Sequence, residues 1–579
     1  MLIDTRQGEE NMDSQGTGRT AREVPVYEVL ATDIKSLGVE AVFGLMSDDT
    51  AIFVTALDMV GITFHGARHE NAAISMAEGY ASATGTLGIA VVGRGPATAN
   101  GLHAAVYAAR AGSRVLIIYG DAAFGAQSTN ALGPDYKAFN VMGVLTAAGL
   151  SVLRATSAAG ARATLSDAAE QAIQGNAVAL LLPTSVQLAI VNDDGEPTPP
   201  VTERQVQAQL ARPEAVQSAL DCLSRSQRPL IIAGLGAHRA GAREVLEQLA
   251  ERTGAMLLTT ARAKEMFLGH PYQIGIIGSF THSIGRRFIE QADSIVVFGA
   301  SLNFWTTSFG TAIPTVPLIQ VDSERGHIGQ WYSADVALVG DAKAVCQQLL
   351  AVLPTRLPED KPFHTPETRQ QIANFDPSGD FQAAHTARTI DPRSLGIALD
   401  RLLPEQRNLV YDAGNFLGIV PYISVPGPDH FKFTTNFASI GLGFGTALGV
   451  ARARPNSTTV LVVGDGGFLM TIGELETVVR EDLPLIIVVM NDCAYGAELH
   501  FLKMHQRPVD KSVFPDVDFA PIAEGFAFEA FTIRSMEDLE QAAPSIASPE
   551  GPILLDCKIN ADVAGSFMSE LAAFEGGQH

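Results

Sequence analysis

The chain has 579 residues, 46% of them hydrophobic and 18% charged, so it is long enough to form several domains with large apolar cores. Its formal net charge of −23 argues against a nucleic acid or an anionic membrane surface as partner. No apolar run reaches transmembrane length and no signal-peptide core precedes the first predicted element. Cys222, Cys346, Cys493 and Cys557 are widely spaced without a metal-binding pattern, so we expect a reduced, cytoplasmic protein.

Three blocks of alternating strand-like and helix-like segments follow one another along the chain, which predicts an α/β fold with parallel sheets. Acidic and Pro-rich stretches separate the blocks and are typical of linkers. In chain order we predict a disordered tail (1–24), a first block (25–190), a linker (191–212), a second block (213–353), a linker (354–390), a third block (391–565) and a C-terminal tail (566–579).

In the first block, a helix is predicted to begin at His69 and Glu70. Small and apolar residues at Ala73 and Ala77 give it a packing face, and Gly85 can end it. A glutamate at this position is most often a solvated charge at the helix N-terminus. A buried carboxylate at this position would instead have a raised pKa, which suits a proton shuttle.

The third block holds the most informative pattern in the chain. An apolar run over residues 460–463 stops at Gly-Asp-Gly-Gly (464–467), an amphipathic segment follows, and a second apolar run over 485–490 ends at Asn491 and Asp492. Both runs are typical of buried parallel strands, whose carboxyl ends meet at one edge of a sheet. Asp465 and Asp492 would therefore lie close together, where two carboxylates and a helix N-terminus suit a magnesium ion that holds a diphosphate. A Gly-rich turn without any ligand is the alternative.

This pattern resembles the thiamine-diphosphate (ThDP) signature, in which GDG is followed at a similar distance by a pair of asparagines. The resemblance implies that Asp465, Asp492 and the backbone carbonyl of Ala494 hold Mg²⁺. Asp492 stands where the family has asparagine, so one extra negative charge enters the site. The block order resembles the acetolactate synthase, 2-oxo-acid decarboxylase and benzaldehyde lyase superfamily. It implies three doubly wound parallel-sheet domains. The first binds the pyrimidine, the second is a middle domain, and the third binds the diphosphate.

The same resemblance implies the other cofactor contacts. Glu70 matches the glutamate that activates the cofactor through its aminopyrimidine ring, and Ile440 matches the apolar residue that holds the cofactor in its bent shape. A plain Gly/Ala-rich start of a buried helix is the alternative for residues 437–445. The remaining expected contacts are Gly414, Asn415, Ala438, Gly466, Gly467, Tyr495, Gly496 and Ala497.

The subfamily is less sharply indicated. Asp48 or Asp49 matches an active-site aspartate of the 2-oxo-acid decarboxylases, and Glu498 matches their catalytic glutamate. The alternatives are a helix N-cap for the aspartates and a solvated charge for Glu498. The decarboxylases also carry a His-His pair, which is absent here; Asn130 in that stretch could position a carbonyl but cannot shuttle a proton.

These resemblances imply non-oxidative decarboxylation of a 2-oxo acid, with the product released or joined to an acceptor aldehyde or ketone. Residues 443–449 and 495–501 look most like benzaldehyde lyase, so a benzaldehyde lyase-like or acetolactate synthase-like carboligase is the alternative, and a catalytically silent regulatory protein a remote one. The turn at 233–237 lacks the GxGxxG fingerprint, so FAD is not predicted. In this superfamily two subunits build each site, which implies a homodimer or homotetramer.

Overall fold

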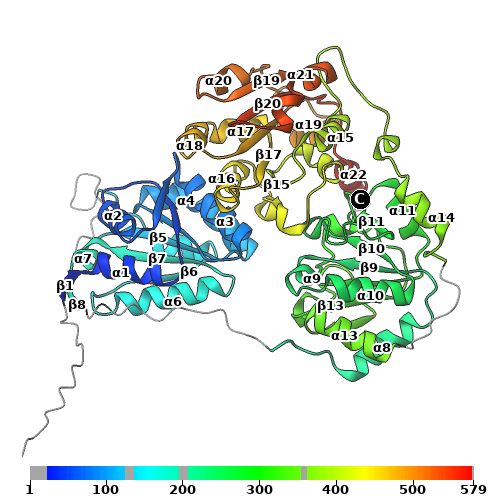
Figure 1. The fold of residues 1–579 in the computed structure, drawn as a ribbon, viewed down its shortest axis with the longest axis horizontal. Helices are drawn as coiled ribbons and strands as arrows, with labels where there is room; N and C mark the ends of the chain where they lie inside the picture. The colour runs from blue at the N-terminus through cyan, green and yellow to red at the C-terminus, as the bar shows by residue number, and fades with distance from the viewer. Residues whose placement is uncertain (1–21, 124–135, 194, 196–206, 354–361, 577–579) are drawn as a thin grey trace, which may run out of the picture.

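Three α/β domains form the structure, which is a computed structural model (Figure 1). It describes residues 22–123, 136–193, 195, 207–353 and 362–576, so residues 1–21 of the predicted tail (1–24) and the candidate Asn130 lie outside the described residues. Each domain is built on a six-stranded sheet in which every described strand pair is parallel, and helices flank the sheets (Figure 1). The predicted fold class is confirmed.

The main sheet of the first domain is flanked by helices α1 to α7. Its strand order is β3-β2-β4-β5-β7-β6. The strands are β2 (Ala41–Gly44), β3 (Thr63–Gly66), β4 (Gly88–Val92), β5 (Val115–Asp121), β6 (Ser151–Arg154) and β7 (Ala177–Pro183). The helices are α1 (Val26–Ser36), α2 (Ala51–Met59), α3 (Glu70–Thr84), α4 (Pro96–Ala111), α5 (Val141–Ala147), α6 (Ala161–Ile173) and α7 (Thr184–Gln187).

The middle domain has a different strand order, β11-β10-β9-β12-β13-β14, which is the 3-2-1-4-5-6 order of dinucleotide-binding folds. Its strands are β9 (Pro229–Ala233), β10 (Met256–Thr259), β11 (Gln273–Ile276), β12 (Ser294–Phe298), β13 (Leu318–Asp322) and β14 (Val336–Val339). Its helices are α8 (Pro213–Leu223), α9 (Leu235–Arg239), η1 (Ala261–Ala263), α10 (Arg243–Thr253), α11 (Ser283–Glu290), α12 (Phe304–Thr307), η2 (Arg325–His327) and α13 (Ala342–Val352).

The C-terminal domain repeats the first domain's strand pattern in the order β16-β15-β17-β18-β20-β19. Its strands are β15 (Arg407–Tyr411), β16 (Phe431–Phe433), β17 (Thr458–Gly464), β18 (Leu485–Asn491), β19 (Glu529–Ile533) and β20 (Ile553–Lys558). Its helices are α15 (Pro392–Leu402), η4 (Asn415–Tyr422), η5 (Pro428–His430), η6 (Thr435–Phe437), α16 (Gly443–Ala453), α17 (Asp465–Thr471), α18 (Glu474–Arg480), α19 (Gly496–Met504), α20 (Ala520–Glu524), α21 (Met536–Ala547) and α22 (Ser566–Gly576).

The first and C-terminal domains share one apolar core, and α3 packs directly on α16. The two helix backbones approach closely because they meet at glycines. A Cβ atom on Gly79 would lie 2.1 Å from the Thr446 carbonyl oxygen, and one on Gly449 would lie 2.0 Å from that of Met76. Gly85 ends α3 in the left-handed conformation with φ of 73°, as the sequence predicts.

The ends of the predicted blocks contain more regular structure than expected. Strand β1 (Arg22–Pro25) pairs antiparallel with β8 (Ile190–Asp193), so the two ends of the first domain lie side by side. The second linker contains α14 (Pro366–Ala373) and η3 (Pro377–Asp380). The predicted C-terminal tail forms α22, because Phe567 and Met568 are buried in the core of the C-terminal domain. None of the helices described is long and apolar enough to span a bilayer.

Candidate active site

Three neighbouring strands of the C-terminal domain end at one edge of the sheet, and each is followed by an acid. Tyr411 in β15 pairs with Val462 in β17, and Gly464 in β17 pairs with Met490 in β18. The strands are buried along almost their whole length, because their apolar side chains pack on both faces of the sheet. This register brings the acids that follow the strands, Asp412, Asp465 and Asp492, to the same edge.

A cavity of about 490 Å³ opens at this edge. Asp465, Asp492 and Glu498 contribute its carboxylates. All predicted cofactor contacts except Glu70 line it, namely Gly414, Asn415, Ala438, Ile440, Asp465, Gly466, Gly467, Asp492, Ala494, Tyr495, Gly496 and Ala497. The sequence prediction therefore identifies one contiguous site, although the roles of the individual residues stay predictions.

Glycines let the backbone of this edge come close to its acids. A Cβ atom on Gly496 would lie 2.4 Å from Oδ2 of Asp492, and one on Gly467 would lie 2.5 Å from Oδ2 of Asp412. Because these positions have no side chain, backbone amides and carboxylates share a small volume. That arrangement suits a ligand carrying negative charge together with a metal ion.

Asp465 and Asp492 are close enough to affect each other's ionisation. The pKa of both carboxyl groups is raised to about 7, mainly by burial, and the charge of Asp465 contributes to the shift of Asp492. The Ala494 amide donates a 3.1 Å hydrogen bond to Asp492. Among the described residues neither acid has a cationic partner and no group of three His, Cys, Asp or Glu side chains gathers. A divalent cation held by two carboxylates, a carbonyl and a diphosphate would neutralise this charge.

Asp412 was not among the predicted site residues, but it positions the loop that carries two of them. Its buried carboxylate accepts hydrogen bonds from the amides of Gly441 (2.7 Å), Leu442 (3.3 Å) and Gly443 (3.1 Å). This fixes the start of α16 and the preceding turn, where Ala438 has a φ of +49°. A non-glycine residue in this conformation indicates that the surrounding structure dictates it. An aspartate directly after a buried strand is the signal that could have identified Asp412.

The cavity also has an aromatic wall that the sequence did not reveal. Trp305 of α12 and Phe567 of α22 both line it, with ring centroids 5.0 Å apart. Asn415 anchors this wall, because its side-chain amide donates to the Val563 carbonyl (3.0 Å) and accepts from the Gly565 amide (2.8 Å). These two bonds leave one N–H donor and one oxygen lone pair of the Asn415 side chain for a ligand. The apolar positions in residues 566–576 were the available signal.

Glu498 lies on the first turn of α19 and is exposed to the cavity. Among the described residues it forms no hydrogen bond or ion pair, so its carboxylate is available to a bound molecule. Tyr495 precedes the same helix and packs edge-on against Phe514, with centroids 4.6 Å apart. The positions of Glu498 and Tyr495 are compatible with their predicted roles, which stay predictions.

Glu70 is the one predicted cofactor contact outside the cavity. It is the first residue of α3, is 8% exposed, and accepts a 3.0 Å hydrogen bond from the Asn100 side chain. The cavity lining consists of middle-domain and C-terminal residues and contains nothing from the described first domain. Within one chain, Glu70 therefore does not face Asp465.

The two acids after β2 are in contrasting surroundings. Asp48 is largely exposed and pairs with Lys137, whose hydrogen bond lowers the pKa of the aspartate to about 2. Asp49 is buried, where it accepts from the Arg94 amide (2.9 Å) and from Ser47. Thr50 occupies the N-cap position of α2 without a side-chain capping bond, so neither aspartate is the N-cap. Asp49 stabilises the turn, and neither acid lines the cavity of its own chain.

Models of a known protein family match the three domains that build this structure. Models of the thiamine pyrophosphate enzymes match the chain in three segments: the N-terminal TPP-binding domain over residues 25–141, the central domain over 216–349, and the C-terminal TPP-binding domain over 412–557. The chain belongs to the thiamine pyrophosphate enzyme family. Both domains predicted to hold the cofactor are thus TPP-binding domains, and the middle block is the family's central domain.

Curated relatives extend over nearly the whole chain. A probable acetolactate synthase large subunit of Methanocaldococcus jannaschii is 26% identical over 548 residues, covering 92% of this chain and 91% of the relative. The acetolactate synthase isozyme 2 large subunit of Escherichia coli K12 is 24% identical, covering 91% and 94%. A probable 2-ketoarginine decarboxylase of Pseudomonas aeruginosa is 26% identical, covering 92% and 93%. Relatives with these different printed activities are about equally distant from this thiamine pyrophosphate enzyme.

Proposed function

We propose that this chain is a ThDP- and Mg²⁺-dependent enzyme that decarboxylates a 2-oxo acid and releases the product or joins it to an acceptor carbonyl. The observation that supports this most is the acid pair of buried Asp465 and half-buried Asp492, which lies beside a glycine-lined edge without a cationic partner among the described residues. The glycine positions leave room for a diphosphate, and the oxygen donors suit Mg²⁺. The residues present therefore fit the cofactor.

Each part of the cavity has a proposed task. Asp465, Asp492 and the Ala494 carbonyl would hold Mg²⁺, and the start of α17 would bind the diphosphate. Once bound, ThDP supplies a carbon nucleophile for the substrate carbonyl and a sink for the electrons left by CO₂. Glu498 would deliver a proton to the reacting carbon, and the rings of Trp305 and Phe567 would exclude water from it.

The position of Glu70 supports a homodimeric or larger assembly. A second copy of the chain would bring its own Glu70 to the cavity, which has no described first-domain residue in its lining. The interface should be large and obligate, since catalysis depends on it. A ThDP-bound, active monomer by light scattering would contradict this assembly.

The direct test is CO₂ release by the ThDP- and Mg²⁺-loaded protein across a panel of 2-oxo acids that differ in side-chain size and charge. Each substrate is assayed with and without an acceptor aldehyde, and the products are separated by chromatography. We expect at least one 2-oxo acid to be turned over with ThDP-dependent CO₂ release. Cleavage of 2-hydroxy ketones without any CO₂ release from the whole panel would instead identify a lyase that needs no decarboxylation.

A further inference from the structure

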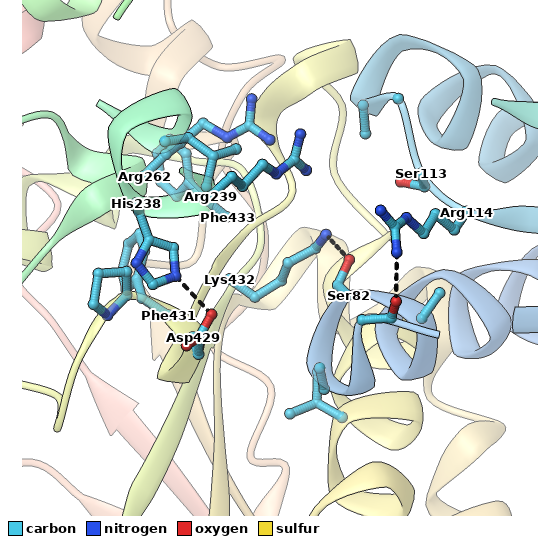
Figure 2. A pocket seen from close by; sticks show the side chains of 18 of the residues that line it. Ser82, Ser113, Arg114, His238, Arg239, Arg262, Asp429, Phe431, Lys432 and Phe433 are labelled. Atoms are coloured by element: carbon cyan, nitrogen blue, oxygen red, sulfur yellow. Dashed lines mark hydrogen bonds and ion pairs between the residues drawn. The ribbon is translucent and has the colours of Figure 1, made fainter. Parts of the chain in front are cut away.

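A second cavity, of about 680 Å³, lies at the junction of the three domains (Figure 2). None of the predicted cofactor contacts lines it. The first domain contributes the end of α3 and the turn at residues 111–114. The middle domain contributes α9 and η1, and the C-terminal domain contributes residues 428–433. A volume of this size is in the range of small-molecule sites.

The cavity is strongly basic. Arg114, Arg239, Arg262 and Lys432 line it, one or two from each domain (Figure 2). Asp429 is the one carboxylate among the lining residues, and it is hydrogen-bonded to His238 at 2.7 Å. The whole chain carries a net charge of −23, so a cavity lined by four cations differs in charge from the chain as a whole. Such a cluster concentrates anions from solution.

Two of the four cations form no ion pair with any residue that the structure describes. Lys432 bonds to Glu78 and to Ser82, and Arg114 donates to the Gly85 carbonyl at 2.8 Å. Arg239 and Arg262 form no hydrogen bond or ion pair with any residue that the structure describes. Their guanidinium groups extend from the middle domain into the space in front of Lys432 and Arg114 (Figure 2).

The electrostatics agree with this geometry. Partial burial lowers the pKa of Arg239, and the charges of Arg262 and Arg114 also lower it. Partial burial likewise lowers the pKa of Arg262, whereas the charges of Tyr107 and Glu78 raise it. Both guanidinium groups stay protonated near neutral pH, since an arginine is effectively always charged. They therefore repel each other, although both side chains are exposed to solvent at the cavity.

The cavity is separate from the crevice where dinucleotide-binding folds hold their ligand. That crevice would lie between β9 and β12, at the point where the strand order reverses. Here the two loops pack on each other: a Cβ atom on Gly299 would lie 2.4 Å from the Ala237 amide nitrogen, and one on Gly234 would lie 2.2 Å from the Gly299 carbonyl oxygen. His238 and Arg239 of α9 line the basic cavity, whereas Ala237 of the same helix lies beside Gly299.

We propose that the three-domain cavity binds a phosphate-bearing anion, with Arg239 and Arg262 as its main ligands and Arg114 and Lys432 completing the site. Guanidinium groups bind phosphate through paired hydrogen bonds, and a pyrophosphate group can engage two of them at once. A singly charged carboxylate would neutralise only one of the two unpaired guanidinium groups of Arg239 and Arg262. The ligand is therefore a pyrophosphate group, either free or at the end of a nucleotide.

Calorimetric titration of the ThDP- and Mg²⁺-saturated enzyme tests this directly, because saturation blocks the cofactor's own diphosphate site. The probes are inorganic pyrophosphate, ADP and adenosine. We expect saturable binding of pyrophosphate or ADP with one site per chain, and none of adenosine. Tighter binding of ADP than of pyrophosphate identifies a nucleotide ligand, and the reverse identifies the free anion. Absence of saturable binding of both phosphate probes overturns the proposal.

Variants localise the binding. Arg239→Gln with Arg262→Gln removes two charge-assisted contacts and should weaken binding by at least about 100-fold. Arg225→Gln with Arg228→Gln removes the same charge from exposed positions of the same domain and should change affinity by less than about threefold. Arg239→Lys with Arg262→Lys keeps the charge and should lie between the two. Equal binding by the Arg239/Arg262 variant and the control pair would show that the anion binds elsewhere.

Discussion

The middle and C-terminal domains are both six-stranded parallel sheets, yet the cavities beside them are opposite in charge. In the C-terminal domain the edge is open, lined by glycines and by the acids Asp465 and Asp492. In the middle domain the corresponding loops close on each other at Gly299, and the open space beside α9 is lined with arginines. The shared architecture sets where a ligand can bind, and the residues after each strand decide which ligand binds there. The following predictions test the acidic half of this comparison.

The largest effect is expected for Asp465→Ala. Loss of a metal-ligating carboxylate leaves the diphosphate poorly neutralised, so ThDP affinity should fall by more than about 100-fold and activity should be lost at ordinary cofactor concentrations. Calorimetry of the cofactor-free protein with ThDP and Mg²⁺ measures this. Glu524→Ala removes an exposed carboxylate from the same domain and serves as control. Full ThDP affinity in Asp465→Ala would place the cofactor elsewhere.

Glu70→Gln should separate binding from catalysis. The variant should keep ThDP, because Asp465 and Asp492 are intact, and should lose about 10²–10⁴ in rate, because glutamine cannot exchange the proton that Glu70 would pass to the cofactor. Proton–deuterium exchange at C2 of the bound thiazolium, followed by NMR, is the specific measurement. Exchange at the wild-type rate would contradict the assignment of Glu70.

Glu498→Gln should change the product more than the rate of CO₂ release. If Glu498 delivers the proton to the product, its loss should slow aldehyde release by about 10²–10⁴ while CO₂ loss in the first turnover is unaffected. An added acceptor aldehyde should then raise the ratio of ligated to free product. A solvated glutamate would predict unchanged ratios and a stability change within about 0.5 kcal/mol.

Asp492→Asn should have the smallest effect on activity, because the amide oxygen can still ligate Mg²⁺. Its main effect is expected on the metal-free protein. Folding raises the pKa of Asp492 from 3.8 to about 7, so this carboxyl stabilises the fold below about pH 4, and that contribution is lost as the pH rises through 7. The variant should therefore gain stability over the wild type at pH 8, by on the order of 1 kcal/mol per unit of pKa shift, and less at pH 5.

Thermal unfolding with chelator at both pH values checks this, and adding ThDP and Mg²⁺ should abolish the difference. A variant that unfolds at the wild-type temperature at pH 8 would show that the two carboxylates do not repel each other in the folded chain. A protein that no longer retains metal would show that the extra carboxylate is required.

The sequence predicted the fold class and most of the cavity lining because both follow from local patterns. Buried parallel strands are continuous apolar runs, and Asp465 and Asp492 come directly after two of them. The aromatic wall was missed because Trp305 and Phe567 lie 262 positions apart and meet only through domain packing. The basic cavity was missed for the same reason, since its four cations come from three domains.

The first-domain acids show the other limit of sequence patterns. Two adjacent aspartates, Asp48 and Asp49, looked interchangeable as candidates for one role. In the structure one is exposed and held ionised by Lys137, and the other is buried in a turn with Arg94. Lys137 is 89 positions away from Asp48, so no local spacing could separate the two.

The antiparallel pair of β1 and β8 has a consequence for how such a chain can be assembled. Because Arg22–Pro25 runs beside Ile190–Asp193, the first domain enters and leaves through adjacent points. A module with neighbouring ends can be exchanged, duplicated or cut from its host with only short joints to repair. The matching strand patterns of the first and C-terminal sheets are what one ancestral module, copied within a gene, would leave behind. The middle domain, with its different strand order, would then be a separate acquisition.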